Sequence, residues 1–366
     1  MNFMDGIMRL SSEAKAQVAS KVIAAVNRCA TQKRRVLLQP VNLFLILALL
    51  SAGPSFAQTC TTADDMDPAT KSALITTAKN YFDLAARGDS ASLRQNAILS
   101  LAADFSGVEA AVNDHKADFS GAQATPRPPF LLVADGPAPA ERAEFLCGVF
   151  GPNGQTANSA EFVIPNLPAG TYGIVILDVP TSKQPYTVSY VLQKEGASWK
   201  LGGYFVKDTQ TNGHDGNWFA TQARAFKAKG QNHNAYLYYL QARELLSPVP
   251  FMSTQRTDKL YDESQAVKPV DIPAEGSSVN LAAGSKTYKL IAVFPLLVGK
   301  DLDLVVKYET PDVSNTTKAF QDNMEVMKAL VTKFPEFRDG FGGVVARAVE
   351  PSGKDYGTLM SMKEIK

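Results

Sequence analysis

The sequence predicts an α+β protein built from several modules. Three observations support this class: apolar residues recur at helical spacing early in the chain, strand-like runs follow, and strands and a helix alternate again near the end. The chain has 366 residues, of which 45% are apolar and 20% are charged. This composition is that of an ordinary globular protein with enough apolar material for more than one core.

The first predicted element is a secretory signal. A basic cluster precedes the apolar run LFLILALL at residues 43–50, and the small residues Ser55 and Ala57 follow at the positions that a signal peptidase reads. We therefore expect residues 1–57 to be an N-terminal extension and signal peptide, cleaved between Ala57 and Gln58. The apolar run spans roughly 12 Å, against ~30 Å for a bilayer core. No stable membrane span is expected after cleavage, and the predicted location is periplasmic or secreted.

Net charge and cysteine content indicate which partners and which cross-links to expect. Residues 1–57 carry seven of the 37 basic and two of the 36 acidic residues, so the remaining chain has a net charge of −4. No basic stripe interleaved with aromatics appears, and nucleic-acid binding is not expected. Cys60 and Cys147 are the cysteines left after cleavage. In an oxidising compartment such a pair is expected to form a disulfide, and the alternative is a buried Cys147 with a free Cys60.

Residues 65–208 are predicted to form the first folded module. Asp67 and Pro68 provide a helix start, and the helix carries one apolar face, made of Leu74, Ala78, Tyr81, Phe82 and Ala85. Gly88 ends this helix, and two further helical segments follow. Strand-like runs between Gly, Pro and Asn come next, at 130–135, 143–150, 160–167, 171–179, 185–196 and 198–208. Helices followed by an antiparallel meander make an α+β unit.

Two segments of this module carry a family resemblance. YFDLAARGDSASL and YVLQKEGASWKLGGYFVKD resemble the first helix pair and the closing hairpin of nuclear-transport-factor-2-like domains, a superfamily that includes ketosteroid-isomerase-like proteins. The resemblance implies a cone-shaped antiparallel sheet wrapped on the N-terminal helices, with a pocket between them. Tyr81, Trp199 and Tyr204 would line that pocket as a ligand site, and the alternative is that these aromatics form core.

A second resemblance covers less of the chain. GPNGQTANSAEFVIPNLPAGTYGIVI is similar to the strand-turn-strand of prealbumin-like, carboxypeptidase-regulatory-type sandwiches. That fold leaves the three preceding helices unexplained, and we prefer the cone fold.

Catalytic residues are not specified by any motif. Enzymes of the cone superfamily place a carboxylate or His against a desolvated cavity, where burial brings its pKa toward neutrality. Asp104, Asp114 and His115 are the candidates here. His115 lies in the polar segment NDHKAD, which is typical of a solvated helix end. The catalytic residues therefore stay unknown.

Residues 218–245 predict two short helices that fold back on each other at Gly230. Small and large apolar residues alternate on them as in one tetratricopeptide-like repeat, which the pattern places at about 216–249: Ala223, Phe226, Ala235, Tyr239 and Ala242. A single repeat cannot bury both of its faces. We expect 214–267 to hold this hairpin plus a capping helix, which acts as a structural linker or as a peptide- or protein-binding surface. His214, Asp215 and His233 lie near this region without a completing ligand cluster, and no metal is expected.

The last part of the chain predicts a smaller α+β domain. Residues 268–286 are rich in Pro, Gly and Ser and are predicted to be a linker. Residues 287–366 then give the order ββαββ, with a helix whose stripe includes Phe320, Met327 and Val331. The segment GFGG lacks the Lys-Ser/Thr of a phosphate loop.

The function expected from these patterns is non-catalytic. Export, unlike modules and the absence of a nucleophile–base motif favour an exported cell-envelope protein that binds an envelope protein or a small apolar ligand, with no cofactor. The alternative is a small-molecule isomerase or hydratase acting in the cone pocket. A third hypothesis is a purely structural role.

Overall fold

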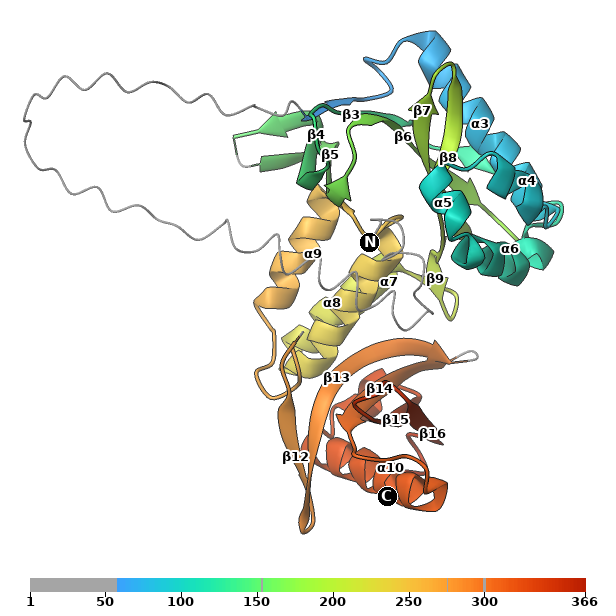
Figure 1. Cartoon of the computed structure of the whole chain (residues 1–366). Helices are drawn as coiled ribbons and strands as arrows, with labels where there is room; N and C mark the ends of the chain where they lie inside the picture. The colour runs from blue at the N-terminus through green and yellow to red at the C-terminus, as the bar shows by residue number, and fades with distance from the viewer. Residues whose placement is uncertain (1–57, 153, 275, 299–300) are drawn as a thin grey trace, which may run out of the picture. The chain divides into compact units, whose positions relative to one another are not determined.

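The computed structural model describes residues 58–152, 154–274, 276–298 and 301–366 (Figure 1). The predicted signal peptide and its cleavage position at Ala57 lie outside these residues. The described chain divides into two compact units. The first contains residues 58–179, 188–206 and 249–252, and the second contains 180–187, 207–248 and 253–366. Helices and mostly antiparallel sheets occur in both, and none of the described sheets closes into a barrel.

The first unit begins with a short strand and four helices. Its elements are β1 (Gln58–Thr61), α3 (Pro68–Ala86), α4 (Ser90–Gln95), α5 (Leu99–Ala103), α6 (Ser106–Phe119), β2 (Thr125–Pro126), β3 (Phe130–Ala134), β4 (Ala140–Gly151), β5 (Gly154–Leu167), β6 (Gly170–Val179), β7 (Tyr186–Glu195) and β8 (Ser198–Asp208). As the sequence predicts, Asp67 caps α3 by accepting a hydrogen bond from the Thr70 amide at 2.9 Å.

The strands of this unit form two sheets. The large sheet has the order β1-β3-β6-β7-β8, with β2 also paired to β6, and the small sheet has the order β11-β5-β4, where β11 is Met252–Thr254. Side chains of β6 alternate between the two faces of the large sheet. Tyr172, Ile174 and Ile176 pack into one core with β4 and β5. Gly173 faces α3 so closely that a Cβ atom would lie 2.1 Å from Cδ2 of Leu74.

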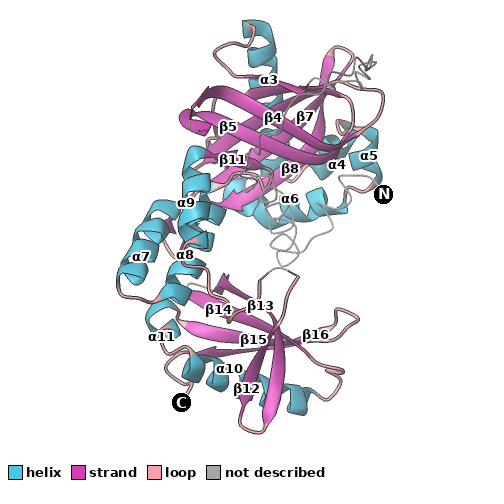
Figure 2. Cartoon of the chain, turned by 90° about the vertical axis from the view of Figure 1, so that its left-hand side faces the viewer, coloured by secondary structure: helices cyan, strands magenta, loops and turns pink. Residues whose placement is uncertain are grey.

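The large sheet is therefore covered on both faces (Figure 2). Helix α3 lies on one face, as the sequence leads us to expect. The small sheet packs on the other face, which the resemblance to cone domains does not include. The first unit therefore consists of mixed α and β layers. Its assignment to the cone class is a proposal.

A disulfide joins the two sheets of the first unit. Cys60 of β1 is bonded to Cys147 of β4, with Cα atoms 5.1 Å apart. This is the pair that the sequence predicts. The bond forms between a strand of the large sheet and the outer strand of the small sheet, and it therefore fixes how one sheet lies on the other.

The second unit combines a helical hairpin with a five-stranded sheet. Its elements are β9 (Gln210–Thr211), β10 (His214–Asp215), α7 (Gly216–Ala228), α8 (Asn232–Leu246), α9 (Gln255–Gln265), β12 (Val279–Ala283), β13 (Lys286–Val298), β14 (Asp301–Glu309), α10 (Thr316–Lys333), α11 (Phe337–Gly340), β15 (Gly343–Val349) and β16 (Asp355–Ser361). The sheet order is β12-β13-β14-β15-β16. Its β14 and β15 run parallel, and α10 makes the crossover between them.

The predicted linker at 268–286 and the order ββαββ need correction. Residues 279–283 form strand β12, which pairs with β13 at Leu281↔Tyr288, and both Leu281 and Ile272 are buried. The sheet therefore has three strands before α10 instead of two. The strand was missed because its sequence, VNLAA, is short and lies between Gly- and Ser-rich segments, so its alternation covers too few residues to detect.

The helical hairpin forms where the sequence predicts it, with its turn at Gly230, whose φ is +76°. At Gly216 a Cβ atom would lie 2.8 Å from the Ala242 carbonyl oxygen, so α7 and α8 approach as closely as a glycine allows. The hairpin core continues into the C-terminal domain, where the Tyr238 hydroxyl donates to the Gly340 carbonyl oxygen. A single hairpin is stable here because its remaining apolar surface packs within the second unit rather than on further repeats.

A polar network holds α10 against the sheet. Asp322 is 6% exposed and accepts hydrogen bonds from Lys286 at 3.0 Å, from the Tyr288 hydroxyl at 2.9 Å and from Lys318. Burial opposes ionisation of this carboxyl, but the three donors together outweigh burial and lower its pKa below the usual value of 3.8.

We expect Asp322→Asn to destabilise the second unit at pH 7. Because the folded pKa is depressed, the contribution of the carboxylate is present above pH 3.8 and is lost as the pH falls through the folded pKa. Urea unfolding at a series of pH values checks this, since the gap between the variant and the wild type should close in acid. A gap that stays constant from pH 7 to pH 3 would contradict it.

Candidate functional site

The predicted pocket residues of the first unit lie in its core. Tyr81, Trp199 and Tyr204 are 5%, 8% and 5% exposed. The Tyr81 hydroxyl donates to the carbonyl oxygen of Trp199 at 3.0 Å. Tyr190, which the sequence reasoning missed, connects the tyrosines, with ring centroids 6.2 Å from Tyr81 and 5.5 Å from Tyr204. Its place in the clean alternation of β7 was the signal that could have found it.

Two hydroxyls of this tyrosine cluster (Tyr81, Tyr190 and Tyr204) are unusual. The hydroxyl oxygens of Tyr190 and Tyr204 are buried, and neither has a hydrogen-bond partner among the described residues. Burial raises the pKa of Tyr81 to about 12 and raises the pKa of Tyr190 and Tyr204 above their usual values. All three phenols are therefore neutral near pH 7, and two of them are donors without an acceptor.

The tyrosines should respond differently to loss of the hydroxyl. Tyr81→Phe removes a hydrogen bond and should lower the free energy of unfolding by about 1 kcal/mol, whereas Tyr204→Phe should leave it unchanged or raise it. Urea unfolding of the two variants measures this difference. A Tyr204→Phe variant as destabilised as Tyr81→Phe would show that the Tyr204 hydroxyl has a partner.

The candidate acid–base residues lie near helix ends. Asp104 follows α5 and accepts a hydrogen bond from the Ser106 hydroxyl at 3.1 Å, in an exposed pair at the start of α6. Asp114 is exposed on α6. His115 stacks on Phe119 one turn later, with ring centroids 5.6 Å apart. The Nδ1 atom of His115 is buried, whereas the two carboxylates are in contact with solvent, and the three residues do not share a pocket among the described cavities.

His214 and Asp215, which lie close together in the sequence, have contacts other than a metal ion. Asp215 caps α7 by accepting from the Trp218 amide at 2.9 Å, and His214 stacks on the Trp218 ring at 3.8 Å. Over the part of the chain that the structure describes, no group of three His, Cys, Asp or Glu is arranged to hold a metal ion.

His233 lies between two carboxylates in the second unit. Its Nδ1 is 2.8 Å from Oε1 of Glu336, and its Nε2 is 2.7 Å from Oδ1 of Asp271. Both ring nitrogens are therefore within hydrogen-bond distance of a carboxylate oxygen. The side chain therefore ties α8 to α11 and to the segment before β12, which explains why residues near 271 do not behave as a free linker.

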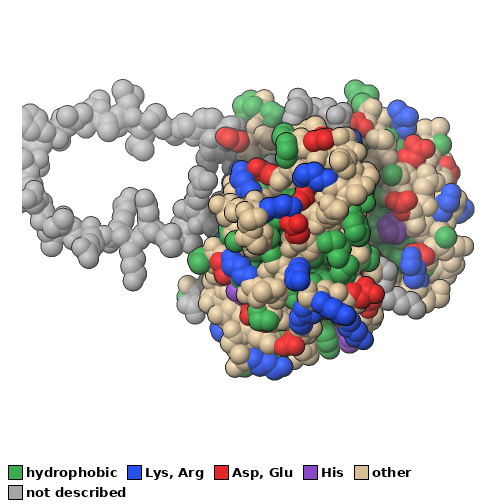
Figure 3. All heavy atoms as spheres, turned by 90° about the horizontal axis from the view of Figure 1, so that it is seen from below, with side chains coloured by type: hydrophobic (Ala, Val, Ile, Leu, Met, Phe, Trp, Pro, Cys, Tyr) green, Lys and Arg blue, Asp and Glu red, His purple; other side chains and the backbone are tan. Residues whose placement is uncertain are grey.

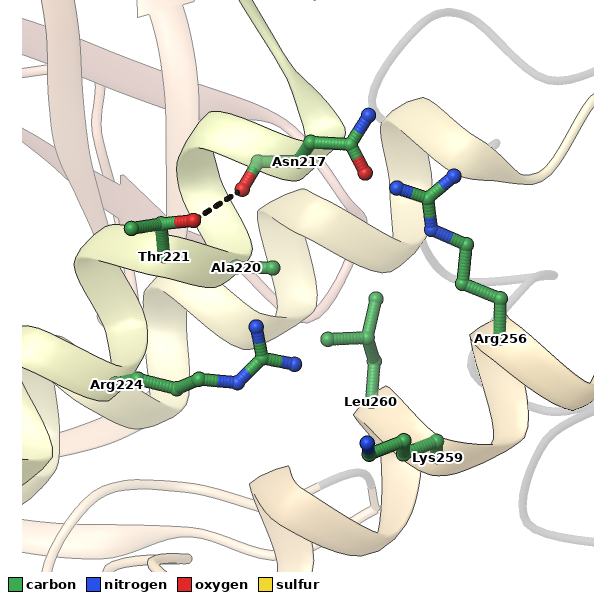
Figure 4. A pocket seen from close by; sticks show the side chains of 7 residues that line it. All are labelled: Asn217, Ala220, Thr221, Arg224, Arg256, Lys259 and Leu260. Carbon is green, nitrogen blue, oxygen red and sulfur yellow. Dashed lines mark hydrogen bonds between the residues drawn. The ribbon is translucent and has the colours of Figure 1, made fainter.

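A cavity of about 150 Å³ lies between α7 and α9. Its lining combines two apolar residues with polar and basic ones, and consists of Asn217, Ala220, Thr221, Arg224, Arg256, Lys259 and Leu260 (Figure 4). We call it the α7–α9 pocket. The buried side chains of Ala220 and Leu260 make its floor, while Arg224 from α7 and Arg256 from α9 reach toward it from opposite sides.

The charges around this pocket are only partly compensated. Arg224 donates to Glu263 from Nε at 2.8 Å and from Nη2 at 3.1 Å, and this hydrogen bonding raises its pKa. Arg256 and Lys259 are exposed, and neither forms an ion pair with any described residue. Lys259 is close enough to Glu263 to contribute to the lowered pKa of that carboxyl, so of the two cations only Arg256 has no interacting acidic group among the described residues. Elsewhere, on the face seen in Figure 3, acidic and basic side chains are interspersed.

A second, larger hollow of about 510 Å³ lies over α4 and α5. It is lined by small and apolar side chains together with Arg94, and it includes Leu99, which is 86% exposed. The Nε of Arg94 already donates to the Ala102 carbonyl oxygen at 2.9 Å. This surface offers less chemistry to select a ligand than the α7–α9 pocket does.

The α7–α9 pocket was not predicted from the sequence. The residues that line it on α7 recur at i, i+3, i+4 and i+7 next to the apolar stripe that predicts the hairpin, and the exposed ones have the pattern of an ordinary solvated helix face.

No family model, no curated protein and no solved structure matches this chain.

Proposed function

We propose that this chain is an exported cell-envelope protein that binds a ligand or partner without catalysing a reaction. The Cys60–Cys147 disulfide supports export, because such bonds form and persist in oxidising compartments. No helix among the described residues is long and apolar enough to cross a membrane. The signal-like sequence before Gln58 also favours export.

The observation that supports binding most strongly is the α7–α9 pocket. Arg256 and Lys259, neither of which forms an ion pair with a described residue, lie at the rim of a cavity with an apolar floor. Scattered surface cations are common, but cations that converge on a concave site raise the local concentration of anions. The proposed ligand or partner therefore carries negative charge at the point of contact.

In this proposal the first unit is a cone-like scaffold of the nuclear-transport-factor-2 type. The helices α3 and α6 that precede the strands, and the contact of α3 with β6 at Gly173, support that class. The tyrosine cluster fills the space between the helices and the sheet, which favours a structural role for this interior.

The alternative function is a small-molecule isomerase or hydratase in the same interior. One observation favours it: the Tyr190 and Tyr204 hydroxyls are buried donors without an acceptor, and a ligand oxygen would satisfy them. Substrate turnover lost in Tyr190→Phe and Tyr204→Phe, with folding intact, would support this alternative.

Thermal unfolding with added anions tests the binding proposal. At matched ionic strength, sodium phosphate or sodium glutamate should raise the melting temperature of the second unit over that in sodium chloride. The rise should disappear in the double variant Arg256→Glu, Lys259→Glu and remain in the charge-matched control Lys227→Glu, Lys328→Glu, whose residues are exposed and do not line the pocket. Equal melting temperatures in all three salts would contradict the proposal.

A further inference from the structure

We infer that the α7–α9 pocket receives an acidic side chain of an extended peptide segment in a partner protein. This inference rests on the proposed function and names the chemistry of its ligand. It follows from the size of the pocket, from its two helical walls and from the position of Arg256.

Size limits what the pocket can hold. Its volume of about 150 Å³ corresponds to roughly five water molecules at about 30 Å³ each. Cavities for whole small-molecule ligands usually have about 300–1,000 Å³. The pocket therefore suits one side chain with a short apolar stem and a charged end. Leu260 and Ala220 would contact the stem, and Arg256 and Lys259 would contact the carboxylate.

The two walls suit a peptide that runs along the helices. On α7, the lining runs from Asn217 to Arg224, which is about 10 Å of helix. Three extended peptide residues span about the same length. The Asn217 amide and the Thr221 hydroxyl lie along this wall, and such groups hydrogen-bond peptide backbones. The Thr221 hydroxyl donates to the Asn217 carbonyl oxygen at 3.0 Å, so it has lone pairs left to accept a peptide N–H.

The position of Arg256 is an independent argument. It lies in the first turn of α9, between Thr254 and Thr257, the two residues that form the capping box. The helix dipole disfavours a cation there and favours an acidic residue. Arg256 forms no ion pair with a described residue, although Asp258 lies in the same turn and suits the helix dipole. The exposed guanidinium of Arg256 therefore gains little inside the fold, which suits a role in binding.

The charge balance favours a carboxylate over a more highly charged group. Glu263 already neutralises Arg224 through two hydrogen bonds. Arg256 remains, together with Lys259, which lowers the pKa of Glu263 but forms no ion pair with it, and the carboxylate of one peptide side chain matches this remaining charge. A nucleic acid would require a continuous basic surface, whereas Arg224 is paired with Glu263 and the other four lining residues are uncharged.

Fluorescence anisotropy with designed peptides tests the inference. The probe is a fluorescein-labelled heptapeptide in which two glutamates flank a leucine, and the comparison peptides carry two glutamines or two lysines instead. The mature wild-type chain at low salt should bind the glutamate peptide about tenfold more tightly than the glutamine peptide, as expected for two exposed ion pairs. Binding should weaken as salt is added.

The decisive experiment reverses the two charges at the pocket rim. The double variant Arg256→Glu, Lys259→Glu should lose the glutamate peptide and bind the lysine peptide instead, while Lys227→Glu, Lys328→Glu behaves as the wild type. The reversed variant should fold, because both residues are exposed and an acidic residue suits the first turn of α9. Its binding of the lysine peptide is a positive signal that an unfolded chain would not give.

The outcomes separate this inference from the proposed function. If phosphate or free glutamate stabilises the wild type but no peptide binds, the pocket takes small anions and the inference is wrong. If glutamate and glutamine peptides bind equally, or charge reversal does not exchange the preference, the inference is also wrong. If neither anions nor peptides bind, the proposed function fails with it.

Discussion

Replacing Cys60 and Cys147 by alanine lowers the free energy of unfolding of the first unit by about 4–5 kcal/mol. The bond joins residues 87 positions apart, and closing a loop of that length removes much conformational freedom from the unfolded chain. The bond also holds β1 in place, since β1 has only one strand partner in the large sheet, β3. Without the bond, β1 is held by its pairing with β3, and a hydrogen bond from the Glu144 amide to the Gln58 side chain links it to β4.

Urea unfolding measured by a probe in the first unit checks this result, since the two units can unfold in separate transitions. Adding a reductant to the wild type should reproduce the effect of the double alanine variant, and should leave that variant unchanged. A loss below about 1 kcal/mol in both experiments would mean that the bond does not constrain the unfolded chain as the loop length predicts.

Phe162→Ala is the substitution with the next largest expected effect, about 3–5 kcal/mol. Phe162 of β5 is fully buried between the small and large sheets, and its ring centroid lies 5.1 Å from that of Phe130 and 6.5 Å from that of Phe251. Truncation loses the transfer free energy of the ring and leaves a cavity that the paired strands cannot close.

Phe162→Leu is the matched control, since it keeps an apolar side chain and should cost clearly less than the alanine variant. Denaturant unfolding of both variants measures the difference. If Phe162→Ala cost as little as a surface substitution, the space between the sheets would not be tightly packed, and the three-layer arrangement of the first unit would be wrong.

Local patterns predicted the helices of this protein well, because their signals lie within a few residues. Asp67 and Pro68 mark the start of α3, and Gly230 marks the turn between α7 and α8. The segments that form β4 and β5 were also predicted as strands. Their assignment to a separate small sheet was not, because pairing and stacking of strands depend on contacts between distant residues.

The site was harder to predict than the elements that carry it. Tyr81 and Tyr204 were predicted to line a ligand pocket, and in the structure both are buried and pack against Tyr190. The α7–α9 pocket was missed because its cations follow the same spacing as any solvated helix face. Its one local signal is the position of Arg256 in the first turn of α9, where the helix dipole opposes it.

The most direct test of binding at the second unit is a methyl NMR titration of residues 58–366 with the unlabelled glutamate peptide. The methyl resonances of Leu260, on the floor of the α7–α9 pocket, should shift in a saturable way, while those of Leu74 and Leu201 in the core of the first unit stay in place. Shifts at Leu74 and Leu201 with none at Leu260 would place the ligand in the interior of the first unit and contradict this account.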